Sequence, residues 1–290
     1  MSQIKEEEEI QIVPKPMEDK PEHLLVLVHG ILAGPSDWTY AQAELKKRLG
    51  RNFVIFSSSR NTFTKTFTGI DGARKRLAEE VMLVLKKRED HTFKKISFLA
   101  HSLGGLIARY ALALLYYSDD PIASPTNKGL ITALQPINFI TLAMPHLSVR
   151  GKKQLPFLFG VPILEKLAAP IAPFFAGQTF SQLFLTDGKP NKPPLLLRMA
   201  SDCDDDKFIS ALGAFKCRRL YANVSYDHTA GWRTSSIRRE TQLFMPPRRS
   251  LDGYKHVVDM EYCPTVPSEG PHFPPEAAKA KEAAQNAPTM

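Results

Sequence analysis

A serine at position 102 stands between an apolar run and a pair of glycines, in the stretch "ISFLAHSLGGLIARYAL" from Ile96 to Leu112. Small residues, Ala100 and Gly104, lie two positions before and after it. This spacing is close to the G-x-S-x-G pattern of a sharp turn from a strand into a helix, with alanine in place of the first glycine. Such a turn strains the serine backbone and exposes its hydroxyl at the end of the strand. We therefore predict that Ser102 is a nucleophile; the alternative is a structural turn without chemistry.

A second glycine-bearing turn lies earlier, where "HGILAG" follows the apolar run His23–Val28. In hydrolases with a serine placed as above, an early loop of this kind supplies a backbone N–H that stabilises the oxyanion of the reaction. The N–H after the serine supplies another. We predict that the N–H groups of Ile31 and Leu103 face one pocket. His29 is expected to be a packed structural histidine rather than a base.

The elements around these turns alternate. Apolar runs predict strands at 23–28, 52–59, 96–100, 137–143 and 218–226, and amphipathic or apolar patterns predict helices at 36–49, 71–85, 103–117 and 231–244. Strands that alternate with helices indicate an α/β fold with a mostly parallel sheet and helices on both faces. Ligands of such sheets bind at the carboxyl ends of the strands, where both turns are expected to lie.

The chain of 290 residues is long enough for one large core. We predict one domain over residues 21–263, after a flexible acidic N-terminus (1–20) and before a disordered tail (264–290). Within the domain, residues 147–194 are dense in Leu, Phe and Pro. We expect them to form an apolar cap over the strand ends; the alternative is that they complete the core.

Composition gives expectations about the location of the protein and about metal or cofactor sites. The sequence has no run of 18 apolar residues and its N-terminus lacks the apolar core of a secretory signal, so neither a transmembrane helix nor secretion is expected. The spacing of the three cysteines, Cys203, Cys217 and Cys263, suits neither a disulfide framework nor a zinc site. We expect a cytoplasmic protein without a metal or other cofactor.

The net charge of +8 is carried by short basic clusters such as Lys46-Lys47-Arg48 and Lys86-Lys87-Arg88. Their simplest interpretation is solvated helix and strand faces. The sharper one is attraction to anionic phosphate. Because no nucleic-acid motif accompanies the charge, nucleic acid is not expected as a partner, and the surface of a membrane or lipid droplet is the alternative.

Several blocks together resemble a known family: "LVHGILAGPSDW", "AHSLGGLIARYA", "TLAMPHL" and "RRLYANVSYDHTAGWRTSSIRR". They are similar to the "putative serine esterase" family of lipase-like α/β-hydrolases, and to its plant members best. The resemblance covers about residues 21–264. It implies an α/β-hydrolase fold and a Ser–Asp–His triad that cleaves acyl esters of lipids. Ser102 matches the nucleophile, and Asp227, expected directly after the fifth strand, matches the acid.

The base histidine has no matching block. Members of the family carry it after a further strand, which this sequence does not offer, so we expect the base to be absent and the fifth strand to lie at an exposed edge. Otherwise the candidates are His256, in a strand-like run, and His272, in a proline-rich loop. His228 is set aside because its ring would have to fold back past Asp227. The alternatives to a lipid esterase are an impaired lipid-binding or interaction protein, and a short-chain esterase or acyltransferase.

Overall fold

The computed structural model describes residues 20–87, 93–116, 133–150, 177–203, 206–227, 230–244 and 256–262. The predicted flexible N-terminus lies outside these ranges up to residue 19, and so does the predicted tail (264–290). Residues 151–176 of the predicted cap are likewise outside them.

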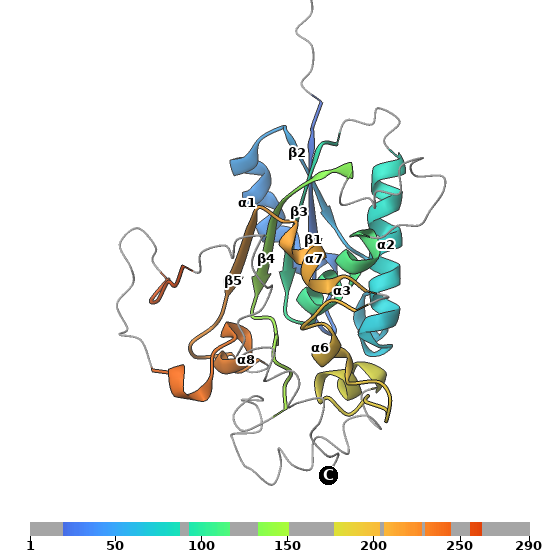
Figure 1. Cartoon of the computed structure of the whole chain (residues 1–290). Coiled ribbons are helices and arrows are strands. Elements are labelled where there is room, and N and C mark those ends of the chain that lie inside the picture. The colour runs from blue at the N-terminus through green and yellow to red at the C-terminus, as the bar shows by residue number, and fades with distance from the viewer. Residues whose placement is uncertain are drawn as a thin grey trace, which may run out of the picture.

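The core of the fold is a five-stranded sheet in the order β2-β1-β3-β4-β5 (Figure 1). Every pair of neighbouring strands in it is parallel. The strands are β1 (His23–Val28), β2 (Phe53–Ser57), β3 (Lys95–His101), β4 (Gln135–Leu142) and β5 (Cys217–Tyr221). The predicted α/β fold with a parallel sheet is confirmed.

Helices cover the sheet on both faces. On one face lie α2 (Ile70–Lys87), α3 (Leu103–Tyr116) and α7 (Phe208–Gly213), and on the other lies α1 (Thr39–Leu49). The shorter elements are α6 (Leu195–Arg198), α8 (Trp232–Ser236) and the 3-10 helices η1 (Pro35–Trp38), η2 (Phe63–Phe67) and η4 (Glu240–Gln242).

Strand β1 shows why the sheet needs both layers. Leu24, Val26 and Val28 pack on the side of α2 and α3, and Leu25 and Leu27 pack on the side of α1. Successive side chains of a strand point to opposite faces of the sheet, and helices cover both faces here. All five side chains are therefore buried. Each such side chain contributes about 1.5–3 kcal/mol when fully buried. The unbroken apolar run in the sequence therefore reflects a central strand.

Three predicted elements differ in the structure. Strand β5 ends at Tyr221, so Asp227 follows it by six residues instead of directly. The predicted helix over 231–244 is interrupted, because Ile237 ends α8 with a left-handed φ of 57°. The strand-like run predicted around His256 forms no strand in its described part, residues 256–262.

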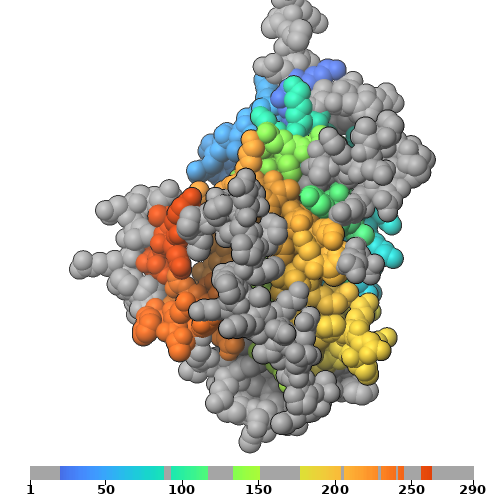
Figure 2. Space-filling model, in the orientation of Figure 1, coloured from blue at the N-terminus to red at the C-terminus, as the bar shows by residue number. Residues whose placement is uncertain are grey.

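The carboxyl ends of the strands form the edge at which ligands of parallel sheets bind. Residues that follow β4 meet two later segments there: Val149 N–H donates to Leu183 O at 3.0 Å, and Leu147 N–H donates to Thr234 Oγ1 at 3.0 Å. In Figures 1 and 2, residues 177–200 occupy the lower right of the molecule and α8 the lower left. The edge at which ligands are expected is thus bordered by both segments.

Two of the basic clusters lie at the opposite edge of the sheet. Lys46-Lys47-Arg48 and Lys86-Lys87 stand in the last turns of α1 and α2. Because these helices run antiparallel to the strands, their last turns lie at the amino ends of the strands. Positive charge there also compensates the partial negative charge of a helix C-terminus. This position favours the simpler interpretation of these clusters.

Candidate active site

Ser102 is the single residue between the end of β3 and the start of α3. Its backbone is left-handed, with a φ of 51°, which costs about 1–3 kcal/mol for a residue other than glycine. Hydrogen bonds on both sides hold it: Ser102 N–H donates to Leu142 O at 2.8 Å, and Gly105 N–H donates to Ser102 O at 2.9 Å. The predicted sharp turn is present, and strain of this kind is typical of functional sites.

Glycine at position 104 is required by close packing. A Cβ there would lie 2.2 Å from His29 O and 2.6 Å from Val28 O, both backbone atoms at the end of β1. At Gly105 a Cβ would lie 2.5 Å from Met144 Sδ. The first turn of α3 is therefore pressed against the end of β1, which brings Ser102 to the turn that follows β1.

That turn, residues 30–34, is called the glycine loop below, and it lies directly beside the serine. A Cβ on Gly30 would be 3.1 Å from both Ser102 Cβ and His101 Nδ1. Within the described part of the chain, the N–H groups of Ile31 and Leu103 have no intramolecular acceptor. Two backbone donors near one hydroxyl are the elements of an oxyanion site, and whether they converge on one pocket stays a prediction.

His29 holds the peptide that carries the N–H of Ile31. Its Nδ1 lies 3.1 Å from Gly30 O, and because a carbonyl only accepts, Nδ1 must carry the proton. The ring is buried, and its Nε2 has no partner among the described residues. The carbonyl of Gly30 and the N–H of Ile31 belong to one planar peptide, so fixing the carbonyl fixes the direction of the N–H.

Asp227 lies near the same edge. Its Oδ1 accepts from Ala230 N–H at 2.9 Å, and its Oδ2 accepts from Asn223 Nδ2 at 2.9 Å. Burial lowers the pKa of His101, and the negative charges of Asp227 and Asp37 partly oppose this effect. The Asp227 carboxylate is thus close enough to act electrostatically on the residue that precedes Ser102.

Comparison with known proteins gives the context of this geometry. The family model described as "Putative serine esterase (DUF676)" matches residues 18–237. The chain belongs to this family. The matched residues include the glycine loop, Ser102 and Asp227, and they end before His256 and His272.

This chain matches only part of the length of its relatives. A protein of Saccharomyces cerevisiae named "Putative lipase YDL109C" is 29% identical over 231 residues, covering 78% of this chain and 32% of that protein. A protein of Schizosaccharomyces pombe also named "Putative lipase" is 27% identical over 223 residues, covering 75% and 26%. The chain therefore spans about a third or less of the length of these relatives. Among solved structures, the mature lipase BlEst2 of Bacillus licheniformis aligns with a TM-score of 0.40 at 17% identity, covering 73% of this chain and 69% of that one.

Of the histidines considered as the base, His256 alone lies within the described residues. His228 and His272 lie outside the described ranges. His256 is exposed, and no hydrogen bond within those ranges joins it to Ser102 or Asp227. Its segment, 256–262, is held to the end of α8 by Arg238, which contacts Asp259 Oδ2 at 2.8 Å and Glu261 Oε2 at 3.2 Å. In Figure 1 this segment lies beyond β5, away from β3. The assignment of His256 stays a prediction.

His146, which follows β4 at the carboxyl ends of the strands, has a ring of low basicity. Burial and the nearby guanidinium of Arg109 lower the pKa of His146 to about 3, and its Nε2 lies 3.3 Å from Thr141 Oγ1. A ring that stays neutral to such low pH is a weak proton acceptor. Among the described residues, no three His, Cys, Asp or Glu side chains are grouped so that they could hold a metal ion.

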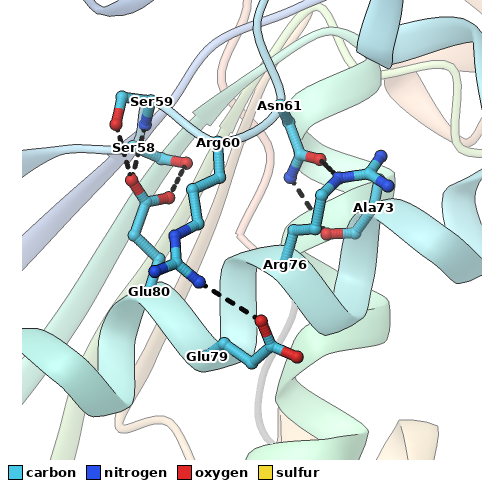
Figure 3. A network of polar contacts seen from close by, with 8 residues as sticks. All are labelled: Ser58, Ser59, Arg60, Asn61, Ala73, Arg76, Glu79 and Glu80. Carbon is cyan, nitrogen blue, oxygen red and sulfur yellow. Dashed lines mark hydrogen bonds and ion pairs between the residues drawn. The ribbon is translucent and has the colours of Figure 1, made fainter.

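Two side-chain contacts that support the site leave no signal in the sequence. The loop after β2 is fixed to α2 by Glu80, whose carboxylate accepts from Ser58 Oγ (2.6 Å), Ser59 N–H (2.8 Å) and Ser59 Oγ (2.9 Å) (Figure 3). Further along this loop, Thr66 Oγ1 accepts the N–H of Leu32 in the glycine loop at 3.2 Å. Neither Glu80 nor Thr66 stands in a motif, because each partner lies more than 20 residues away.

Proposed function

We propose that this chain is a serine hydrolase of the lipase/esterase class that cleaves acyl esters of lipids through an acyl-enzyme at Ser102. The observation that carries the proposal is the left-handed backbone of Ser102, held between β3 and α3. Beside it lie two backbone N–H groups that have no acceptor among the described residues. Membership in a serine esterase family and the name of the yeast relatives support it.

The proposed mechanism assigns a role to each group. Ser102 Oγ attacks the acyl carbonyl carbon as its proton passes to an imidazole, since a neutral serine is a poor nucleophile. The N–H groups of Ile31 and Leu103 stabilise the oxyanion, and loss of one such donor costs about 10²–10³ in rate. The imidazolium then protonates the leaving alcohol, and water releases the acid from Ser102. Asp227 would orient the imidazole and stabilise its charged form.

A second candidate is a lipid-binding protein of the same fold with impaired catalysis. The observation that favours it is the exposure of His256 on a segment beyond β5. Without a base, an oxyanion site alone still gives about a thousandfold acceleration over water, far below a complete triad. A third, a short-chain esterase or acyltransferase, uses the same groups on a smaller acyl chain.

A fluorophosphonate probe tests the proposal, since it labels serines that are activated as nucleophiles. We expect labelling of the full chain that Ser102→Ala abolishes, with hydrolysis of an aryl ester falling at least about a thousandfold. Ser36→Ala, at an exposed serine, is the control and should behave as wild type. Unlabelled wild-type protein that still binds lipid would establish the second candidate instead.

Separate alanine substitutions at His256 and His272 test the base. A loss of about a hundredfold or more in either variant would identify it, because general base catalysis contributes about 10²–10⁴. Wild-type rates in both would place the base outside these two residues.

The chain length of the substrate separates the first and third candidates. We propose that residues 147–194 cover the strand ends as an apolar cap, since their described parts, 147–150 and 177–194, lie at that edge. Each methylene buried under a cap contributes about 0.8 kcal/mol, so activity should rise with acyl length. Rates that are highest for acetyl esters would favour the short-chain esterase.

We propose peripheral association with anionic membranes or lipid droplets. None of the helices in the described ranges combines the length and apolar character that a bilayer crossing needs. The basic clusters predict binding to anionic vesicles that added salt weakens. Co-sedimentation that is absent or unaffected by salt would contradict it.

A further inference from the structure

The middle of the glycine loop is joined to a neighbouring element. Leu32, next to the proposed donor Ile31, is 56% exposed and has a left-handed φ of 53°. Two hydrogen bonds join the loop to the neighbouring 3-10 helix η2: Leu32 N–H donates to Thr66 Oγ1 at 3.2 Å, and Phe63 N–H donates to Ala33 O at 3.0 Å. The position of the loop therefore depends on η2.

The hydroxyl of Thr66 is oriented toward the glycine loop by a second hydrogen bond within η2. The side chain is buried, with 1% exposure, and its hydroxyl donates to Phe63 O within η2. Because a hydroxyl has one proton, this bond leaves the lone pairs of Oγ1 directed to an external donor, which is Leu32 N–H. The direction of the Leu32 bond is thus set by the internal geometry of η2.

The carbonyl of Thr66 is held by a distant residue. Thr179 Oγ1 donates to Thr66 O at 2.6 Å and accepts Gly69 N–H at 2.9 Å. Thr179 is fully buried, with 0% exposure. It stands in residues 177–183, at the start of the second described part of the proposed cap. One threonine therefore joins that segment both to η2 and to Gly69, the residue before α2.

Neighbouring contacts make this junction rigid. Gln182 accepts Ile70 N–H at 2.6 Å and donates to Asp71 Oδ1 at 2.8 Å, which satisfies the start of α2. Gly177, with a φ of 70°, approaches the backbone so closely that a Cβ would lie 2.6 Å from Phe67 O. Segments more than 100 residues apart in the sequence thus form one unit.

We propose that Thr66 is a positioning residue that couples the segment 177–183, through Thr179, to the glycine loop that carries Ile31. The catalytic part of this inference rests on the proposed function, since Ile31 matters only if its N–H binds the oxyanion. The coupling itself is a property of the fold. Loss of either hydroxyl should loosen the loop, and the oxyanion would then be stabilised less well.

Hydrogen–deuterium exchange of the full chain tests the coupling without any reference to activity. Thr179→Val keeps the shape of the side chain and removes the hydroxyl. We expect exchange of the Leu32 N–H, which donates to Thr66 Oγ1, to become about tenfold faster in this variant, the change that one neutral hydrogen bond supports. Thr66→Val should do the same, and Thr179→Ser should restore protection.

Thr68→Val is the matched control, because its hydroxyl contacts Lys65 O and Arg76 and not the loop. Exchange of the Leu32 N–H that is unchanged in Thr179→Val would overturn the coupling.

Kinetics with a soluble aryl ester test the positioning role. Thr66→Val should lower kcat by about 10–100-fold and leave KM within about twofold, because the oxyanion exists only beyond the ground state. Affinity for a boronic acid, which forms a tetrahedral anion on serine, should fall in parallel, and Thr66→Ser should recover both. A kcat equal to that of Thr68→Val would overturn this role. If Ser102→Ala hydrolyses as fast as wild type while the exchange result holds, the proposed function fails and the coupling stands.

Discussion

At the scale of single residues, the approach of α3 to β1 depends on the absence of one methyl group. Gly104→Ala would place a Cβ 2.2 Å from His29 O, and a backbone atom cannot move aside as a flexible side chain can. We expect the free energy of unfolding of the variant to be lower by about 1–3 kcal/mol, as in other overpacked cores. The turn at Ser102 should shift with it, so fluorophosphonate labelling should fall by about a hundredfold. Urea unfolding and labelling rates measure the two effects.

Gly72 provides the matched control, since it is a glycine within α2. A Cβ there would meet only Arg76 Nη1, at an ordinary distance of 3.5 Å. Gly72→Ala should therefore keep full labelling and gain up to about 1 kcal/mol from the higher helix propensity of alanine. Equal stability of Gly104→Ala and wild type would contradict the tight packing of α3 on β1.

At the scale of elements, the contact of α2 with the loop after β2 depends on a buried carboxylate. Glu80 is 6% exposed and accepts three hydrogen bonds from Ser58 and Ser59 (Figure 3). Glu80→Ala leaves these donors unpaired, and hydrogen bonds to charged groups are worth about 1.5–3 kcal/mol each. Since such losses are not additive, we expect a destabilisation of about 3 kcal/mol, measured by urea unfolding.

The neighbouring residue separates this effect from a general loss of negative charge. Glu79 forms an ion pair with Arg60 at 3.2 Å in which both side chains are well exposed. Exposed pairs contribute about 0–1 kcal/mol, so Glu79→Ala should unfold close to wild type. A similar cost in both variants would show that the buried carboxylate has no special role.

Elements were predictable from the sequence where local pattern and tertiary packing agree. Strands β1 and β3 were predicted almost to the residue because burial on both faces leaves an unbroken apolar run. Strand β5 was predicted too long, since its side chains are mostly exposed and no pattern marks its end. The helix over 231–244 was predicted too long because the reversal at Ile237 is not encoded by a glycine or proline.

The same contrast holds within the candidate site. The turn at Ser102 was predictable because its small residues must be close in sequence. Thr66 and Thr179 were not, because their contacts join segments 113 residues apart and any threonine could make them. A reactive residue in a tight turn can be recognised from the spacing of its neighbours in the sequence. The residues that position it can be recognised only in the folded structure.

At the scale of the whole molecule, buried histidines should make the fold sensitive to acid. Burial, and then the charge of Lys95, lower the pKa of His23 to about 4 from a usual 6.5. The ring stacks on Phe53, and its Nε2 lies 2.8 Å from Ser97 Oγ. Between pH 6.5 and 4 the unfolded chain binds a proton at His23 that the folded chain does not, so stability falls as the pH decreases.

The expected loss of stability at acidic pH follows from the lowered pKa of His23. Lowering the pH from 7 to 4.5 should reduce the free energy of unfolding through His23 by at most about 3 kcal/mol. His146, whose pKa is lowered to about 3, should add to the loss in the same direction. In His23→Gln the pH dependence of urea unfolding should become shallower, while in His256→Gln, at an exposed position, it should match wild type. A wild-type stability that is constant from pH 7 to 4.5 would show that His23 titrates alike in both states, and that its burial beside Phe53 and Ser97 does not hold it neutral.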